Sequence, residues 1–247
     1  MRVGGIVLVL GSAPQAVACA DWDLSTVDDL VVINNAWNIR RDWSVLIHPD
    51  DFPADRWPKD IGPAQQIIRS EEYVPAQNTY GGFVYAGGTM AFTAGYWALA
   101  ALRPRVLGFF GCDMVYPPRS PTHFYGTGRA DPLRDDPTLQ SLEAKSARLE
   151  LFAARQGCAC VNLSQEESRL VFARATHADF FAHPAPKVPE LSPADRQEAL
   201  ADYRCASGRY WEMPEAFAPD VLASIDGLWL SAHRAHFGER AFRAPAA

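Results

Sequence analysis

The sequence lacks the features that mark membrane proteins and proteins that bind duplex nucleic acid. No apolar run approaches the roughly 20 residues of a membrane-spanning helix, so we expect no membrane span. The formal net charge is −6, from 23 basic and 29 acidic residues, whereas a duplex-binding protein usually carries a basic patch. We therefore expect no duplex nucleic acid as a partner, although backbone donors could still bind a nucleotide.

Cysteine is scarce, and familiar catalytic motifs are missing. The five cysteines are odd in number and scattered, which favours reduced thiols and a cytoplasmic location over a disulfide framework. Cys158 and Cys160 do not have the CxxC spacing of a zinc or redox site. The opening stretch, "MRVGGIVLVLGSAP", lacks a signal-peptide cleavage pattern, so we interpret it as a first strand. No HExxH, GxSxG or aspartate-rich nucleotidyltransferase motif is visible.

Apolar runs alternate with helical patterns along most of the chain. Strands are predicted over 5–10, 29–33, 43–48, 105–111 and 157–164, with a weaker one over 65–70. Helices are predicted over 88–102 and 136–157. This alternation is typical of an α/β protein with an open, mainly parallel, Rossmann-like sheet and flanking helices. A ligand of such a sheet binds beyond the carboxyl ends of the strands.

The composition changes near residue 184. We expect an α/β nucleotide-binding domain over 1–184 and a helical C-terminal extension over 185–247. Ser192 and Pro193 are suited to the N-cap and first position of a helix in that extension. The extension could cover the active site, pack on the sheet or mediate formation of a homo-oligomer.

Small and polar residues follow the predicted strands. The candidates for nucleotide binding are the turn after the first strand, two asparagines after the second, a glycine pair before the helix at 88–102, and a serine after the last strand: Gly11, Ser12, Ala13, Asn34, Asn35, Gly87, Gly88, Thr89 and Ser164. Exposed amides at a helix start suit phosphate. For both glycine-containing turns, tight packing is the structural alternative.

The loop after the strand at 105–111 carries Asp113, Tyr116 and His123. A histidine can act as a general base near neutral pH, although many loop histidines are merely solvated. Asp113 could be catalytic or could cap the loop. His48 follows another strand and could also line a site. Asp50 and Asp51 could hold a hard cation or form a helix cap and solvated turn.

The order of these motifs resembles the bacterial sialyltransferases of glycosyltransferase family 42. It also resembles their wider relatives, domain of unknown function 115, the 6-hydroxymethylpterin diphosphokinase-like proteins. The resemblance covers about residues 5–175 and is carried by "GSAP" at 11–14, "NNAW" at 34–37, "GGT" at 87–89, "GCDM" at 111–114 and "THF" at 122–124. A second tyrosine, expected in the strand before Gly111, and an arginine, expected before the glycine pair, have no counterpart.

The resemblance implies a GT-A-like fold and a nucleotide-sugar-dependent glycosyltransferase activity, sialyltransferase-like in its general scheme. His123 would then be the general base, and Tyr116 would stabilise the departing phosphate. The donor would be a nucleotide sugar, with a CMP type as one option, and the acceptor a small molecule or glycan. No metal would be obligatory. Two alternatives stay open. One is a Mg²⁺-dependent diphosphate transferase acting on a pterin-like alcohol, with Asp50, Asp51 and Asp113 as metal ligands; the other is a non-catalytic nucleotide-binding module.

Overall fold

A single parallel β-sheet forms the centre of the molecule in the computed structural model, which describes residues 4–117, 121–127 and 134–238. Within these residues the sheet has seven strands: β1 Ile6–Leu10, β2 Asp29–Ile33, β3 Val45–Ile47, β4 Gln66–Ile68, β5 Val106–Phe110, β6 Ala159–Asn162 and β7 Ala173–Arg174. Their order is β4-β3-β2-β1-β5-β6-β7, and every neighbouring pair is parallel. The prediction of an α/β protein with a parallel sheet is confirmed.

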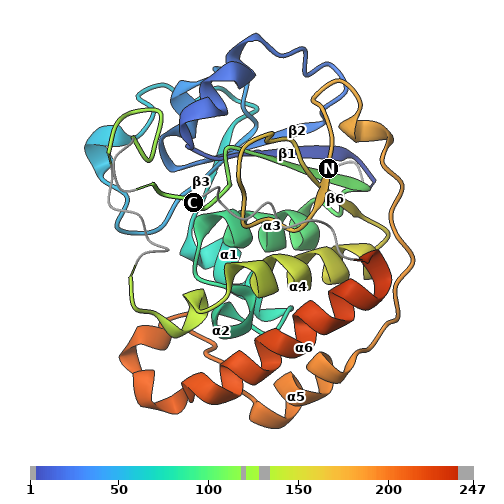
Figure 1. The fold of residues 1–247 in the computed structure, drawn as a ribbon. Helices are drawn as coiled ribbons and strands as arrows, with labels where there is room; N and C mark the ends of the chain where they lie inside the picture. Colours follow the sequence, from blue (N-terminus) through green and yellow to red (C-terminus); the bar gives the residue numbers. More distant parts are fainter. Residues whose placement is uncertain (1–3, 118–120, 128–133, 239–247) are drawn as a thin grey trace.

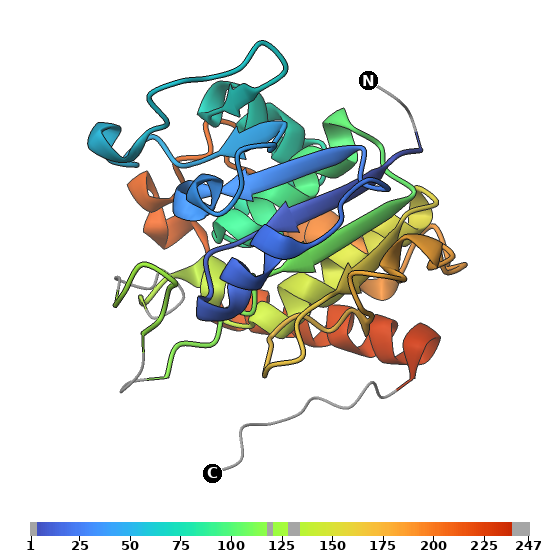
Figure 2. The same ribbon diagram turned by 90° about the horizontal axis from the view of Figure 1, so that it is seen from above.

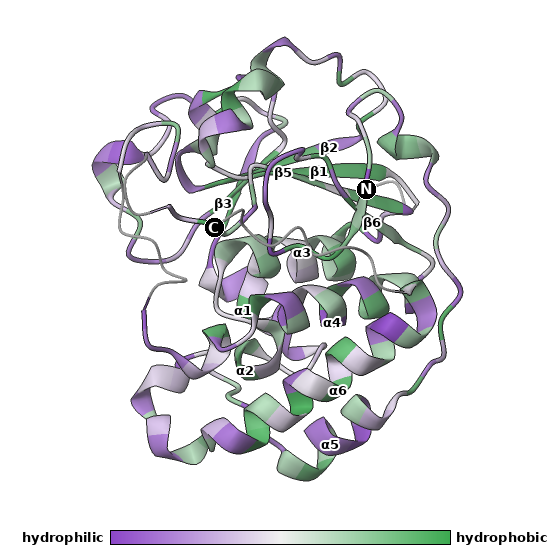
Figure 3. Ribbon diagram, viewed as in Figure 1, coloured by the Kyte–Doolittle hydropathy of each residue, from purple (hydrophilic) through white to green (hydrophobic). Residues whose placement is uncertain are grey.

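The central strands are apolar because both faces of the sheet are covered (Figures 1 and 2). In β1, Val7 and Val9 face one hydrophobic cluster while Leu8 and Leu10 face another. The helices on the first face are α1 Ser70–Asn78, α3 Met90–Ala101 and α4 Leu142–Arg155. The second face is covered by short 3-10 helices, including η1 Pro14–Asp21, η2 Asn34–Asn38 and η6 Phe180–Ala182. Figure 3 shows the strands as predominantly hydrophobic.

Side-chain caps set the starts of the two predicted helices. Helix α3 begins at Met90. Its N-cap is Thr89, whose hydroxyl accepts a hydrogen bond from the Phe92 amide at 3.3 Å. The helix predicted over 136–157 begins later than expected, because Ser141 caps α4 and residues 137–139 form a separate 3-10 turn, η5 Pro137–Leu139. We predicted no helix where α1 lies, a segment that contains Pro75. The short helix α2 Phe83–Ala86 was also not predicted.

The C-terminal part contributes two further helices, α5 Pro193–Ala201 and α6 Pro219–Phe237; α6 packs on α4, and α5 packs on α6 (Figure 1). Helix α5 starts with the Ser192 cap and Pro193 that the sequence predicted. Trp229 on α6 and Ala194 on α5 join a third hydrophobic cluster with Tyr85 on α2 and Leu151 on α4. The C-terminal helices therefore lie against the helical layer rather than against the sheet.

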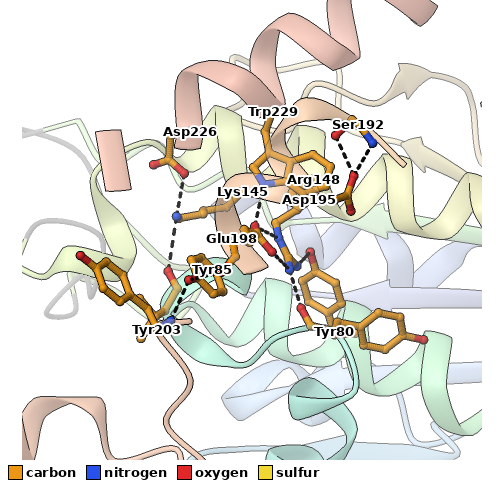
Figure 4. Close-up of polar contacts among 12 residues, drawn as sticks. Tyr80, Tyr85, Lys145, Arg148, Ser192, Asp195, Glu198, Tyr203, Asp226 and Trp229 are labelled. Atoms are coloured by element: carbon orange, nitrogen blue, oxygen red, sulfur yellow. Dashed lines mark hydrogen bonds and ion pairs between the residues drawn. The ribbon is translucent and has the colours of Figure 1, made fainter. Parts of the chain in front are cut away.

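Buried ion pairs join these helices to α4 (Figure 4). Lys145 Nζ lies 2.8 Å from Asp226 Oδ1 on α6, and both side chains are less than 5% exposed (1% and 4%). Arg148 contacts both carboxylate oxygens of Glu198 on α5 at 2.7 Å, and the Trp229 indole donates to Glu198 Oε1 at 2.6 Å. Arg148 also donates to the carbonyl of Tyr80. Charged side chains thus fix the position of the C-terminal segment as well as apolar packing does.

Two further properties follow from the described residues. Cys19, Cys112, Cys158, Cys160 and Cys205 are all free and buried. None of the helices in the described part of the chain combines the length and apolar character needed to cross a membrane.

Candidate functional site

The parallel sheet brings the strand-end motifs to one edge. Gly11 follows β1, Asn34 follows β2, His48 lies one residue beyond β3, Gly111 follows β5, and Ser164 lies two residues beyond β6. The carboxyl ends of parallel strands share an edge, and ligands of open α/β sheets bind there. We refer to this row of strand ends as the carboxyl edge.

The chain segments that leave β1 and β5 are in direct contact. The Gly11 amide donates to the Phe110 carbonyl at 2.8 Å, and the Ala13 amide donates to the Gly111 carbonyl at 3.0 Å. A Cβ atom on Gly11 would lie 2.2 Å from the Gly111 oxygen, so no other residue fits without movement of the backbone. The turn at Gly11, Ser12 and Ala13, which we predicted to hold a phosphate, therefore uses two of its amides within the protein.

Asp113 and Ser164 meet at the carboxyl edge through Gln15. The Gln15 amide donates to Asp113 Oδ2 and lies 3.3 Å from the Ser164 hydroxyl. Burial raises the pKa of the Asp113 carboxyl above its ordinary value, although the hydroxyls of Ser168 and Ser164 act in the opposite direction. The structure thus brings together two predicted site residues, and it adds Gln15, which the sequence did not single out.

His123 lies over the turn that follows β1. The amide of the next residue, Phe124, donates to the Ser12 carbonyl at 3.0 Å, which fixes this loop on the carboxyl edge. The His123 ring centroid lies 5.9 Å from that of Tyr116 and stacks on Tyr125 at 4.9 Å. Thr122 Oγ1 lies 2.9 Å from His123 Nδ1. The predicted pair of His123 and Tyr116 is therefore brought together in space.

Three buried polar atoms on the carboxyl edge have no hydrogen-bond partner among the described residues: Asn34 Oδ1, His48 Nε2 and Asp113 Oδ1. His48 Nδ1 lies 2.8 Å from the Pro49 carbonyl oxygen, an acceptor, so the neutral ring carries its proton there and Nε2 is an acceptor. All three atoms are consequently acceptors. Since buried polar atoms are nearly always paired, such a row indicates that donors come from a water or a ligand.

A cavity of about 990 Å³ opens beside this edge. Its walls come from the loop after β3, helix α1, Phe83 on α2, the start of α3, residues 134 and 136, and the C-terminal segment 206–212. Gly88, one of the predicted nucleotide-binding residues, lines this cavity. Asp50 and Asp51, which were considered as cation ligands, line it too. We call this space the acidic cavity, because acidic side chains outnumber arginines on its walls.

Three other predicted nucleotide-binding residues, Gly87, Thr89 and Asn35, have local structural roles. Gly87 has a φ of +95°, and a Cβ atom there would lie 2.8 Å from the Phe92 ring. The Thr89 hydroxyl caps α3 and lies 3.5 Å from the Met114 sulfur. Asn35 is buried within η2, where its carbonyl accepts from the Asn38 side chain at 3.2 Å. These contacts account for Gly87, Thr89 and Asn35 without a ligand.

One wall of the acidic cavity is a hydrogen-bonded cluster that the sequence did not predict. Arg134 lies 2.8 Å from Asp136 Oδ2 and donates to the Tyr210 hydroxyl at 2.9 Å, while Tyr210 donates to Asp136 at 2.9 Å. Burial acts to raise the pKa of Asp136. Hydrogen bonds from Thr138 and the charge of Arg134 act in the opposite direction, and the pKa is lower than its ordinary value. Tyr210 lies 74 residues from Asp136 in the sequence, so only the fold reveals this contact.

The three aspartates proposed as Mg²⁺ ligands do not come together. Asp50 and Asp51 line the acidic cavity, whereas Asp113 is buried behind Gln15 at the carboxyl edge. Over residues 4–117, 121–127 and 134–238, no group of three histidine, cysteine, aspartate or glutamate side chains could hold a metal ion.

These observations define an α/β protein with an all-parallel sheet and a polar carboxyl edge beside a large cavity. Comparison of the chain with protein-family models, curated proteins and solved structures finds no match. The family resemblance of the motifs is therefore a prediction that rests on the residues alone.

Proposed function

We propose that the protein is a nucleotide-sugar-dependent, glycosyltransferase-like enzyme whose Rossmann-like, GT-A-like sheet binds the donor at the carboxyl edge. The observation that supports this most directly is the row of unpartnered acceptors, Asn34 Oδ1, His48 Nε2 and Asp113 Oδ1. A nucleotide sugar offers several O–H and N–H donors along one extended molecule, which fits acceptors that are spread over neighbouring strand ends.

His123 is the general base in this proposal. With its proton on Nδ1, the ring donates to Thr122 Oγ1, at a distance of 2.9 Å, and Nε2 is the basic atom. Nε2 takes the proton of the acceptor hydroxyl as that oxygen forms a bond to the sugar carbon, while the bond from that carbon to the nucleotide phosphate oxygen breaks. Tyr116, whose ring lies beside that of His123, hydrogen-bonds the departing phosphate.

A Mg²⁺-dependent diphosphate transferase acting on a pterin-like alcohol is the second candidate. Asp50 and Asp51 favour it, because both line the acidic cavity and carboxylate oxygens suit Mg²⁺. In that case the metal would sit in the acidic cavity, without Asp113. A non-catalytic nucleotide-binding module is the third candidate, and it would need neither His123 nor a metal.

A nucleotide binding screen combined with His123→Ala tests the proposal. We expect CMP or CDP to raise the melting temperature without Mg²⁺, since a ligand that binds only the folded state stabilises it. His123→Ala should lower kcat for transfer from the matching nucleotide sugar by about 10²–10⁴-fold, the usual contribution of a general base. The melting temperature and the response to nucleotide should be retained.

His236→Ala is the matched control, because His236 is exposed on α6, far along the chain from the proposed site. It should leave turnover unchanged. Full activity of His123→Ala would contradict the assigned base, and a thermal response that requires Mg²⁺ would favour the diphosphate transferase.

A further inference from the structure

The acidic cavity has more negative charge than its own arginines neutralise. Its lining contains five carboxylates and two arginines: Asp50, Asp51, Glu71, Asp136, Glu212, Arg134 and Arg209. Asp136 is paired with Arg134 at 2.8 Å, and Glu212 lies 3.5 Å from Arg209. The other three carboxylates lie in two neighbouring segments, 50–51 and 71.

These three carboxylates have no ion pair within the described part of the chain. Asp50 accepts a hydrogen bond from the Ser70 hydroxyl at 2.7 Å, which positions its carboxylate but leaves its charge unbalanced. Asp51 and Glu71 line the same cavity. Like charges that line one cavity repel one another, and a bound cation reduces that repulsion.

A buried hydroxyl in the same cavity points to a ligand independently of the charges. Thr93 on α3 lines the cavity although only 1% of its surface is exposed. Its Oγ1 has no hydrogen-bond partner among the described residues. A helical threonine commonly satisfies its hydroxyl on the carbonyl one turn earlier. Here that bond is absent, so the buried hydroxyl has unused hydrogen-bonding capacity beside the cavity.

Aromatic rings complete the lining. Phe83 stacks on Tyr210 with 6.2 Å between ring centroids, and Tyr73 meets Phe83 edge to face at 6.1 Å. All three line the cavity. Aromatic faces beside carboxylates attract organic cations, because the ring quadrupole adds to the charge attraction.

We infer that the acidic cavity binds a hydroxylated amine, such as an amino sugar, with its ammonium group on Asp51 and Glu71 and a hydroxyl on Thr93. The cavity volume of about 990 Å³ accommodates a ligand of sugar or nucleoside size. This site is separate from the acceptor row of Asn34, His48 and Asp113, and its occupation does not require nucleotide binding.

Isothermal titration of the full chain with glucosamine and with glucose tests this inference. At about pH 6, where a primary amine is protonated, glucosamine should bind at least about tenfold more tightly than glucose, the effect of one favourable charge interaction. The double variant Asp51→Asn/Glu71→Gln should abolish this preference. Thr93→Val, which replaces the hydroxyl by a methyl group, should weaken binding of glucosamine severalfold.

Asp60→Asn provides the control, because Asp60 is exposed and lies outside the cavity lining. It should retain the preference for glucosamine. Equal binding of the two sugars, or a preference that survives in the double variant, would overturn the inference. Binding of Mg²⁺ that depends on Asp51 and Glu71, without binding of glucosamine, would also overturn it and would assign the cavity to a metal. A failure of CMP to bind would refute only the proposed donor site.

Discussion

At the scale of single residues, Asp113 is a buried acid whose charge costs stability. Its carboxyl is 4% exposed, one oxygen has no partner among the described residues, and burial raises its pKa. Because its pKa is raised, this carboxyl binds a proton more tightly in the folded state than in the unfolded state. The free energy of unfolding therefore falls as pH rises from the ordinary pKa of 3.8 through the raised value. Such a cost is typical of a functional site.

Asp113→Asn should therefore stabilise the protein at neutral pH. We expect a gain of about 1 kcal/mol in the free energy of unfolding, because the variant no longer buries a charge with an unpaired oxygen. The difference from the natural chain should shrink as pH falls and Asp113 becomes protonated. Urea unfolding of both proteins between neutral and acidic pH measures this difference.

Asp23→Asn should behave in the opposite way, because hydrogen bonds from Ser25 lower the pKa of the exposed Asp23. The natural chain should have a higher free energy of unfolding than that variant, and this difference should be lost as pH falls.

If Asp113→Asn destabilises the protein at neutral pH, Asp113 is mainly a loop cap. If the variant is stable but inactive, the acid is required for function.

The sequence could place individual candidate residues at the carboxyl edge only where they come just after a strand. Asn34, Gly111 and Asp113 were predicted to lie there because ligands of a parallel sheet bind beyond the carboxyl ends of its strands, and the structure places all three at that edge. Gln15 and Tyr210 were missed, since each contacts a residue far away in the sequence, Asp113 and Asp136 respectively. Thr93 lies within an apolar helical stretch, and nothing in the sequence shows that its hydroxyl is unpaired.

At the scale of elements, continuous apolar runs predicted the strands to within a few residues, because burial on both faces leaves little choice of side chain. Strand β2 matches the predicted 29–33 in full, β1 differs from its prediction by one residue at its start, and β5 differs by one residue at each end. Strand β7 has two residues, too few for any pattern. Helix α1 contains Pro75, which argues against a helix in the sequence, although Glu72 favours one because its carboxylate accepts from the Arg69 amide at the helix start at 2.9 Å.

The contact between α4 and α6 depends on a buried ion pair. Lys145→Met should reduce the free energy of unfolding by about 3 kcal/mol, since it leaves Asp226 buried without its partner. The double variant Lys145→Met/Asp226→Leu should recover most of that loss, because an apolar pair of similar volume avoids the cost of burying charge. Chemical unfolding of the two variants measures both effects.

Arg169→Met is a suitable control for that prediction. Arg169 pairs with Glu143 at 2.7 Å but is half exposed, at 50%, so its loss should cost less than about 1 kcal/mol. A double variant as unstable as Lys145→Met alone would show that the charged pair itself, rather than the isolated acid, determines the packing of α6.

At the scale of the whole molecule, the acidic cavity is assembled from segments that no local pattern connects. Its walls combine residues 49–51, 70–75, 88–93, 134–136 and 206–212. The sequence predicted a helical C-terminal extension and left open whether it covers the active site, packs on the sheet or mediates self-association. In the structure this extension packs on α4 and closes one side of the cavity.

This arrangement implies that the C-terminal helices are part of one cooperative folding unit with the sheet. Lys145, Arg148 and Glu150 on α4 are at most 2% exposed (1%, 1% and 2%), and their partners Asp226, Glu198 and His233 all come from α5 and α6. A fragment of residues 1–184, the α/β domain expected from the sequence, would expose these charges and the apolar surface beside them. We therefore expect that this fragment does not fold on its own.

Circular dichroism and calorimetry of the full chain and of the fragment 1–184 test this expectation. The full chain should unfold in one transition, with coincident loss of near- and far-ultraviolet signals, and the fragment should show no cooperative transition. Two separate transitions in the full chain, or a fragment that melts cooperatively, would show instead that residues 185–247 are an independent addition. In that case the C-terminal wall of the acidic cavity could be removed without unfolding the sheet. The fragment would then bind glucosamine only if Asp50, Asp51, Glu71 and Thr93 suffice for binding.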